Sequence, residues 1–433
     1  MEKNRKEIAK NTNQKEARPN LVKNKPPHLD DIYACLQCGY CNSVCPIYRE
    51  TGWESLTPRG KVYLLRHLIS KNSIIDKVLG KKIADILTSR GKISLEEAMI
   101  KIYTCTLCSR CETICHVDID FHEYWEQIRK WMVENGIKPP PNTIDMYNNI
   151  ANEGYKNPFM EPVSKRDEWY RDEYKLPEKA DIVYFIGCMS SYHEYQILLS
   201  TLKVFTSAGL NFTTLGTDEM CCGAINTMTG QWDNFKKIAE NNVRQIKKRG
   251  ATKVITGCPA CYRAIKKYHK FVDFNFELFH TTQIAAILIK KGRLKFTKKF
   301  DEKNQPIIYH DPCELGRVME YESKGIFETP RYILNNIPSI NKVLEFPNNR
   351  MDSICCGGGG GLRAVNYNLT TDITQRKIDE AIELGASTIV SACPNCKAQF
   401  SDAIEIKKEK MKDSKEKFKM KVMDVIDVVA KCI

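Results

Sequence analysis

The stretches VITGCPACYRA, residues 254–264, and IVSACPNCKAQ, residues 389–399, repeat one pattern, and this pattern decides the fold. Each is a short apolar run that leads into a CPxC pair. Two further pairs recur in the same order. VYFIGC at 183–188 corresponds to IIYHDPC at 307–313, and CCGA at 221–224 corresponds to CCGGGGG at 355–361. Three markers in one order predict a domain doubled by duplication.

Short apolar strands alternate with amphipathic helices from Ala180 to the C-terminus. We expect strands at Asp181–Ile186, Lys253–Thr256, Pro306–Tyr309, Lys342–Phe346 and Thr388–Ser391. We expect helices at Glu194–Ala208, Trp232–Lys248, Thr281–Lys290, Thr374–Leu384 and Lys421–Ala430. This alternation predicts α/β layers with mainly parallel sheets, in a first repeat at 180–300 and a second at 301–433.

Two other cysteine runs lie upstream, in residues 31–135, with a helical stretch expected between them at Gly60–Glu97. CLQCGYCNSVCP begins at Cys35 and CTLCSRCETICH begins at Cys105. Both have the C-x2-C-x2-C-x3-C spacing of cubane 4Fe–4S clusters, in which the fourth cysteine of each run ligates the other cluster. We therefore assign Cys35, Cys38, Cys41 and Cys115 to one cubane and Cys105, Cys108, Cys111 and Cys45 to the other. A helical, dicluster ferredoxin-like domain ahead of the repeats makes the chain α+β overall.

Zinc is the alternative occupant of these runs, but zinc sites usually gather two CxxC pairs at longer separation. Two complete four-cysteine runs favour iron. The second run ends in His116, where the motif usually has proline. A surface or hydrogen-bonding role is expected for this histidine, with ligation or tuning of the potential as the alternative.

The remaining segments connect or precede these domains. Residues 136–179 are polar, contain Pro139–Pro141, and are expected to form a linker that wraps over the surface. Residues 1–30 carry eight Lys or Arg against four acids and predict a disordered basic arm. The net charge is +13, yet no nucleic-acid recognition motif accompanies it.

Composition limits the location of the protein and the role of its cysteines. No secretory leader is evident, and apolar runs such as Ile284–Ile289 are too short to cross a bilayer, so a cytoplasmic protein is expected. Nineteen cysteines in such a chain, grouped as CxxC and CC, indicate metal ligands rather than disulfides.

Each repeat carries five cysteines, one more than a cubane needs. The first set is Cys188, Cys221, Cys222, Cys258 and Cys261, and the second is Cys313, Cys355, Cys356, Cys393 and Cys396. Five thiols fit either a larger, more open iron–sulfur centre or a four-ligand centre with a spare reactive thiol. Zinc is again an alternative, whereas a thioredoxin-like role for the CxxC pairs would leave both CC pairs unexplained.

Other residues beside the second set are candidates for a role. Gly357–Gly361 would let backbone approach a cluster or ligand closely, and it lacks the pattern of a nucleotide-phosphate loop. His310, Asp311, Glu314 and Arg317 flank Cys313 and are candidates to supply a proton or bind an anionic substrate.

At these residues the sequence resembles the CCG-domain iron–sulfur proteins, most closely the family of D-type heterodisulfide reductase subunits. The resemblance covers about Asp31 to the C-terminus. It implies a non-cubane 4Fe–4S cluster on each five-cysteine set, with a first spacer in the second repeat that is slightly long at 41 residues. Two such clusters and two cubanes use eighteen cysteines, and Cys432 is expected to be inert.

The resemblance also implies a function. Two facing non-cubane clusters would each take one sulfur of a disulfide, such as the mixed disulfide of coenzyme M and coenzyme B, while the cubanes feed electrons singly. The partner would be a flavoprotein or a membrane cytochrome subunit, with peripheral membrane association as one arrangement.

A second resemblance gives a rival function. CPIYRETGWESLTPRGKVYLLRHL at 45–68 is similar to the iron–sulfur subunits of glycolate, lactate and glycerol-3-phosphate dehydrogenases. That resemblance implies an electron relay from a flavin partner to quinone or another carrier.

Overall fold

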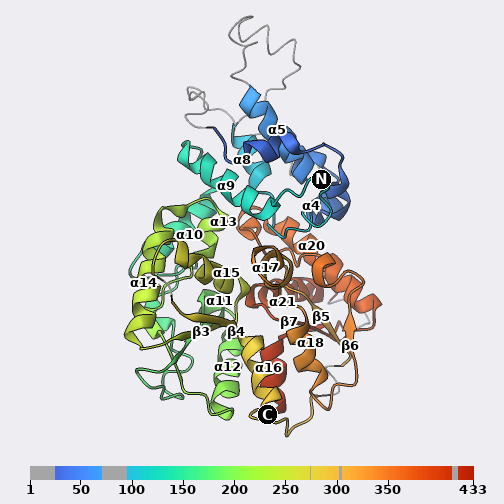
Figure 1. Cartoon of the computed structure of the whole chain (residues 1–433). Coiled ribbons are helices and arrows are strands. Elements are labelled where there is room, and N and C mark those ends of the chain that lie inside the picture. Colours follow the sequence, from blue (N-terminus) through green and yellow to red (C-terminus); the bar gives the residue numbers. More distant parts are fainter. Residues whose placement is uncertain (1–24, 71–94, 274, 302–304, 412–417) are drawn as a thin grey trace, which may run out of the picture.

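The computed structural model describes residues 25–70, 95–273, 275–301, 305–411 and 418–433. A helical N-terminal domain stands on two α/β repeats that lie side by side beneath it (Figure 1). The predicted class, a helical dicluster domain followed by a duplicated α/β domain with parallel sheets, is confirmed. Most of the basic arm expected at 1–30 lies outside the described residues.

The N-terminal domain is made of short helices around the cysteine runs. They are α2 (Leu29–Ala34), α3 (Tyr40–Val44), α4 (Pro46–Thr51), α5 (Pro58–Ser70), α8 (Leu95–Tyr103) and α9 (Phe121–Glu134). Helices α5 and α8 lie at the two ends of the expected helical stretch, and 71–94 lie outside the described residues. Asp120 caps helix α9, because its side chain accepts a hydrogen bond from Glu123 N.

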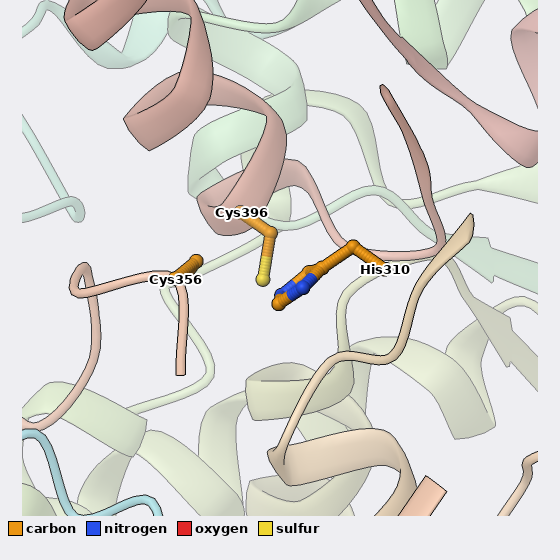
Figure 2. Close-up of side chains that lie close together, drawn as sticks. All are labelled: His310, Cys356 and Cys396. Carbon is orange, nitrogen blue, oxygen red and sulfur yellow. The ribbon is translucent and has the colours of Figure 1, made fainter. Parts of the chain in front are cut away.

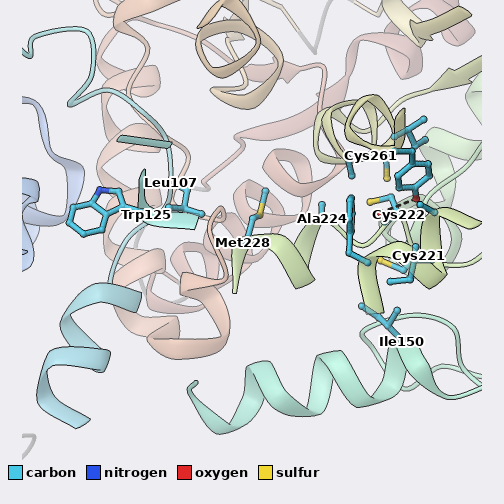
Figure 3. Packing of buried hydrophobic residues seen from close by; sticks show 14 of the residues in the cluster. Leu107, Trp125, Ile150, Cys221, Cys222, Ala224, Met228 and Cys261 are labelled. Carbon is cyan, nitrogen blue, oxygen red and sulfur yellow. Dashed lines mark hydrogen bonds between the residues drawn. The ribbon is translucent and has the colours of Figure 1, made fainter. Parts of the chain in front are cut away.

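The core of this domain continues into the first repeat. Trp125 and Leu107 belong to the same buried cluster as Met228 and Cys222 of the repeat (Figure 3). The Tyr103 hydroxyl also donates to Thr229 O at 2.7 Å across the boundary. The dicluster domain is therefore packed on the repeats through a shared apolar core.

Each repeat contains a four-stranded parallel sheet. In the first, the order is β2-β1-β3-β4, with β1 (Ile182–Phe185), β2 (Phe212–Thr214), β3 (Lys253–Thr256) and β4 (Glu277–His280). In the second, the order is β6-β5-β7-β8, with β5 (Ile307–His310), β6 (Val343–Glu345), β7 (Thr388–Ser391) and β8 (Lys421–Asp424). The same strand order confirms the duplication.

Helices surround both sheets. The first repeat has α11 (Cys188–Tyr192), α12 (Tyr195–Ser207), α13 (Ala224–Met228), α14 (Phe235–Lys248), α15 (Pro259–Lys267) and α16 (Thr281–Lys290). The second has the π-helix η7 (Glu314–Val318), α17 (Met319–Glu322), α18 (Glu328–Asn335), α19 (Leu362–Val365), α20 (Tyr367–Glu383), α21 (Pro394–Lys410) and α22 (Val425–Cys432). Helix α12 packs on α22, and α16 packs on α18, so each repeat contributes one early and one late helix to the interface.

One predicted helix is wrong over its first four residues. Lys421–Asp424 form strand β8 on the edge of the second sheet, and α22 begins only at Val425. The Asp424 side chain explains this start, because it accepts a hydrogen bond from Ile426 N at 2.9 Å. The strands β2 and β4 are not predicted either.

Other helix starts differ from the prediction by one turn or two. Helix α20 begins seven residues before the expected Thr374, because the Asn366 side chain accepts from Leu369 N and caps it there. Trp232–Asn234 form a 3-10 turn ahead of α14. The predicted helix Thr281–Lys290 and strands Lys253–Thr256 and Thr388–Ser391 are confirmed as they stand.

The connector expected as a surface linker at 136–179 is packed in part. It contains helix α10 (Pro141–Ala151), and Asn157 and Arg166 within it are completely buried. Lys156 O accepts a hydrogen bond from Cys221 N at 2.8 Å. This segment therefore helps to hold the first CC pair in place.

Candidate metal centres

The two four-cysteine runs follow similar backbone paths. In the first, Gln37 and Gly39 flank the second cysteine with φ angles of 56° and 84°. In the second, Leu107 and Ser109 flank Cys108 with φ angles of 53° and 57°. These left-handed residues turn each loop tightly, so that successive thiols face one point.

The loops enclose two small cavities lined by cysteine. The first is lined by Cys35, Cys38, Cys41 and Cys115, and the second by Cys45, Cys105, Cys108 and Cys111. These are the groupings assigned from the sequence, with one cysteine of each run at the cavity of the other. His116 borders the first cavity, is exposed, and packs edge-on against Tyr40 at 4.9 Å between ring centroids.

The lining suits an anionic sulfide cluster. Of the described residues around the two cavities, none is acidic, and each cavity has one basic side chain, Arg59 or Lys61. Lys61 is 1% exposed, and its ammonium donates to Thr104 O at 2.7 Å. Burial lowers the pKa of Lys61, and the neighbouring Cys105 and Cys45, when they are thiolates, oppose this shift. Among the described residues Lys61 has no carboxylate partner. A buried cation needs a negative charge nearby, and a thiolate-bound cluster would supply one.

Burial opposes ionisation of the free thiols. It raises the pKa of Cys41 and of Cys45 to about 12. Since the thiolate is the metal ligand, metal must displace these protons when it binds.

The five cysteines of the first repeat form one cluster, called site 1. The Sγ atoms of Cys188 and Cys221 are 3.9 Å apart. Hydrogen bonds continue from Cys221 to Cys222, then to Cys261, and from Cys261 to Cys258. Hydrogen bonds from Cys188 and Cys222 lower the pKa of Cys221, so the group favours one thiolate.

The cysteines of the second repeat form site 2 in the same manner. Hydrogen bonds link the thiols of Cys313 and Cys355, and those of Cys355 and Cys356. Cys396 is hydrogen-bonded to both Cys356 and Cys393. Hydrogen bonds from Cys355 and Cys396 lower the pKa of Cys356.

The sheets explain where these sites lie. Cys188 and Cys258 follow the carboxyl ends of the neighbouring central strands β1 and β3, and Cys313 and Cys393 follow β5 and β7. In the first sheet β2 lies on one side of β1 and the next strand, β3, lies on the other side. In the second sheet β6 and β7 flank β5 in the same way. Such a switch point opens a crevice at the carboxyl ends of the strands, where α/β proteins bind ligands.

Both sites open into one cavity of about 570 Å³. All five cysteines of site 1 line it, together with Cys313, Cys356, Cys393 and Cys396 of site 2. Asn395 of the second repeat crosses this region, with its amide 3.6 Å from Cys258 Sγ. The duplication therefore places two sulfur clusters around a space large enough for a small molecule.

Site 2 also contacts the dicluster domain. The thiols of Cys108 and Cys355 are hydrogen-bonded, and burial adds to the raised pKa of Cys108. Arg317 strengthens this junction, since its guanidinium donates to Cys108 O at 2.8 Å and to Ser353 O at 2.9 Å. The second four-cysteine cavity and site 2 are thus neighbours.

The glycine run makes this close approach possible. A Cβ on Gly360 would lie 2.5 Å from Cys105 O, and one on Gly359 would lie 2.7 Å from Thr106 O. Gly357, Gly360 and Gly361 also have φ angles of 99°, 63° and 75°. The run therefore brings backbone against the loop of the second four-cysteine cavity.

The residues that flank Cys313 have different surroundings. Asp311 forms a bidentate pair with Arg331 at 2.7 Å for both contacts, which is a structural role. Glu314 lines the shared cavity, 3.5 Å from Arg263, and burial raises its pKa. His310 is buried beside Cys356 and Cys396, and burial lowers its pKa to about 3.

Sequence reasoning missed several buried charges that hold the sites. Arg129 donates to Gly360 O at 2.8 Å, Met228 O at 2.6 Å and Cys105 O at 3.3 Å, and so joins all three domains. Arg166 pairs with Glu219 at 2.6 Å, and Glu219 accepts from the backbone just before Cys188. No local motif identifies such residues, because their partners are distant in the chain.

The stretch TPRGK, residues 57–61, is packed in part. Thr57 and Lys61 are buried, and a Cβ on Gly60 would lie 2.1 Å from Glu54 O. Arg59 borders the first four-cysteine cavity and Lys61 borders the second. Cys432 is buried in the core between the repeats, away from the other cysteines.

Fold and sites together define a class: a dicluster ferredoxin-like domain fused to two cysteine-rich α/β repeats. The model of the CCG cysteine-rich domain matches residues 182–266 and 307–401. The model of the 4Fe-4S dicluster domain matches residues 31–119, and these matches cover more than half of the chain.

Similar proteins indicate which family within this class the chain belongs to. The D-type subunit of the dihydromethanophenazine:CoB–CoM heterodisulfide reductase of Methanosarcina barkeri is 33% identical over 413 residues, which cover 94% of this chain and 95% of that protein. The chain belongs to this family of D-type heterodisulfide reductase subunits, within the CCG iron–sulfur proteins.

More distant relatives are longer. The probable iron-sulfur-binding oxidoreductase FadF of Bacillus subtilis is 26% identical, over 94% of this chain and 60% of that protein. The EtfAB:quinone oxidoreductase of Syntrophomonas wolfei is 25% identical, over 94% of this chain and 58% of that protein. The chain is accordingly an iron–sulfur oxidoreductase subunit. No described helix is long and apolar enough to cross a membrane.

Proposed function

We propose that this chain is the disulfide-converting subunit of a heterodisulfide-reductase-like complex. The single observation that carries the proposal is the cavity of about 570 Å³ that cysteines of both repeats line. The cofactors would be two cubane 4Fe–4S clusters in the four-cysteine cavities and two non-cubane 4Fe–4S clusters at sites 1 and 2. When bound, such clusters supply one-electron transfer and iron that can take sulfur ligands.

The reaction in the reducing direction is R–S–S–R′ + 2 e⁻ + 2 H⁺ → R–SH + R′–SH. The S–S bond breaks, each sulfur gains one electron and one proton, and a mixed disulfide such as that of coenzyme M and coenzyme B is the substrate. Sulfur-lined walls on both sides of one cavity suit a molecule that ends as two thiols. The same arrangement serves disulfide formation when electrons leave.

The chain's own residues have clear tasks in this proposal. The Cys108–Cys355 contact joins the dicluster domain to site 2, which supports electron entry at this junction. Arg129 and Arg317 fix the junction through backbone carbonyl groups of its two sides. Bulky and aromatic side chains, among them Met189, Phe159 and Tyr367, line the cavity around the sulfurs and limit water.

The electron donor would be a partner protein, either a flavoprotein or a membrane cytochrome subunit. Iron–sulfur assembly calls for a reducing compartment, so we expect the complex in the cytoplasm or at the inner face of the membrane. The alternative function is an electron relay for a flavin-dependent 2-hydroxy acid or glycerol-3-phosphate dehydrogenase. That relay would not need a cavity shared by the two sites.

The test is disulfide reduction by anaerobically purified protein, with a reduced viologen dye as the artificial donor and the coenzyme M–coenzyme B disulfide as substrate. Dye oxidation that depends on the disulfide, and is lost in Cys356→Ser but kept in Cys432→Ser, supports the proposal. Full iron content without any disulfide-dependent oxidation favours the relay.

A further inference from the structure

The two repeats differ at one position beside their sulfur clusters. Phe185 is the last residue of β1 and pairs in register with Thr256. His310 is the last residue of β5 and pairs in register with Ser391. Each position lies three residues before the first cysteine of its set. The duplication therefore puts a hydrocarbon ring at site 1 where site 2 has an imidazole.

The imidazole is directed at the sulfurs of site 2. A ring nitrogen of His310, Cys356 Sγ and Cys396 Sγ all lie within 4.8 Å of one another. Figure 2 shows the ring extending from the end of β5 toward the Cys396 sulfur. Distances of this size are compatible with three ligands of one metal ion.

No other partner accounts for the ring. His310 is 1% exposed, and within the described part of the chain neither of its nitrogens has a hydrogen-bond partner. Phe400 and Phe346 pack against it edge-on, with ring centroids 5.1 Å and 6.3 Å away, and hold its plane. A buried polar atom without a partner is costly, so a rigid unpaired imidazole beside thiols points to a ligand absent from the chain itself.

We propose that His310 supplies a nitrogen ligand to the iron–sulfur cluster of site 2, which makes this centre a mixed sulfur and nitrogen site while site 1 is held by cysteine alone. The inference rests on the proposed function, because it needs a cluster at site 2. Imidazole is a common iron ligand.

The two sites would then differ in their ligands, and the site with the added nitrogen is also the one that contacts Cys108 of the dicluster domain.

The test is nitrogen hyperfine spectroscopy on protein with ¹⁵N-labelled histidine. The Cys222→Ser background removes the site 1 cluster, so that site 2 is the remaining non-cubane centre. Pulsed electron–nuclear double resonance should then detect the strong coupling of a nitrogen bonded directly to the cluster. His310→Phe, which copies the first repeat, should abolish this coupling.

His280→Gln is the matched control. His280 is a buried histidine of the first repeat whose ring is hydrogen-bonded to Gly257 O and to Thr282. It should leave the coupling unchanged. Full iron content at site 2 without strong nitrogen coupling, or coupling that survives His310→Phe, overturns the histidine ligand alone. Absence of iron at site 2 in wild-type protein overturns the proposed function as well. The nitrogen coupling is measured first in the Cys222→Ser background with His310 in place, so a poorly folded His310→Phe leaves this test intact.

Discussion

The thiol of Cys108 is hydrogen-bonded to Cys355, so a residue of the dicluster domain touches one of the two five-cysteine sites. The two residues are distant in the chain, and Arg317 and the glycine run hold their loops together. This contact makes the two five-cysteine sites unequal in their relation to the dicluster domain. Of the two five-cysteine sites, site 2 is joined to the four-cysteine cavities by a sulfur–sulfur contact, and the predictions below depend on this junction.

Gly360→Ala should weaken the junction. The new Cβ would lie 2.5 Å from Cys105 O, where backbone must move. Gly385→Ala is the control, because Gly385 also has a positive φ, 78°, but nothing lies within 4 Å of its Cβ position. We expect Gly360→Ala to cost about 1–3 kcal/mol more than the control in thermal unfolding. Equal losses of stability in the two variants would show that the glycine run is not a packing contact.

Lys61→Met should make the neighbouring cubane harder to reduce. The buried ammonium offsets negative charge near Cys45 and Cys105, and reduction adds one more negative charge. We expect a shift to more negative potential, on the order of 1 to 2 kcal/mol in the free energy of reduction. A redox titration followed by EPR measures it, with the exposed Lys237→Met as control. A shift to more positive potential would contradict the placement of this cubane.

Glu219→Gln should destabilise site 1 selectively. The change leaves Arg166 buried without a counter-charge and weakens the acceptor for Ile186 N and Gly187 N. A loss of about 3–5 kcal/mol in the free energy of unfolding is expected for a broken buried pair.

The neighbouring Asp218→Asn breaks a more exposed pair with Arg249 and should cost less than about 1 kcal/mol. Iron analysis should find less iron at site 1 of Glu219→Gln and unchanged cubanes. Full iron at site 1 would mean that this pair supports the fold but not the cluster.

Cys356→Ser should remove the iron of site 2 and leave both cubane signals. The thiol of Cys356 is hydrogen-bonded to both Cys355 and Cys396, so it is central to site 2. Cys432→Ser is the matched control, because Cys432 is equally buried but lies in the core between the repeats. Loss of a cubane signal alone in Cys356→Ser, or loss of iron in Cys432→Ser, would show that the ligand assignments are wrong.

Much of the fold could be predicted from the sequence because its signals are local. Strands such as Lys253–Thr256 are β-branched runs directly ahead of a CPxC pair, and cysteine spacing reports which thiols share a loop. Strand β8 could not be predicted, because its residues lead directly into helix α22 and pairing with β7 decides their state. Only the fold shows that Asp424 caps helix α22, which follows it in the chain.

The candidate sites were predictable as sets of cysteines but not as an arrangement. Spacing identifies the five members of site 2, whereas the contact with Cys108 depends on how separate domains pack. The sequence also does not show that the residues flanking Cys313 have different surroundings. Asp311 forms an ion pair with Arg331. His310, the residue before it in the sequence, lies instead beside the sulfurs of Cys356 and Cys396.

The most direct test of the central claim is metal analysis of anaerobically purified protein, with iron, sulfide and zinc measured per chain. EPR of the oxidised protein should accompany it, with and without added thiol. Four 4Fe–4S clusters predict about sixteen irons, together with a paramagnetic signal that appears only with thiol. About eight irons, with zinc at sites 1 and 2, would leave the dicluster domain standing and contradict the disulfide chemistry proposed for the shared cavity.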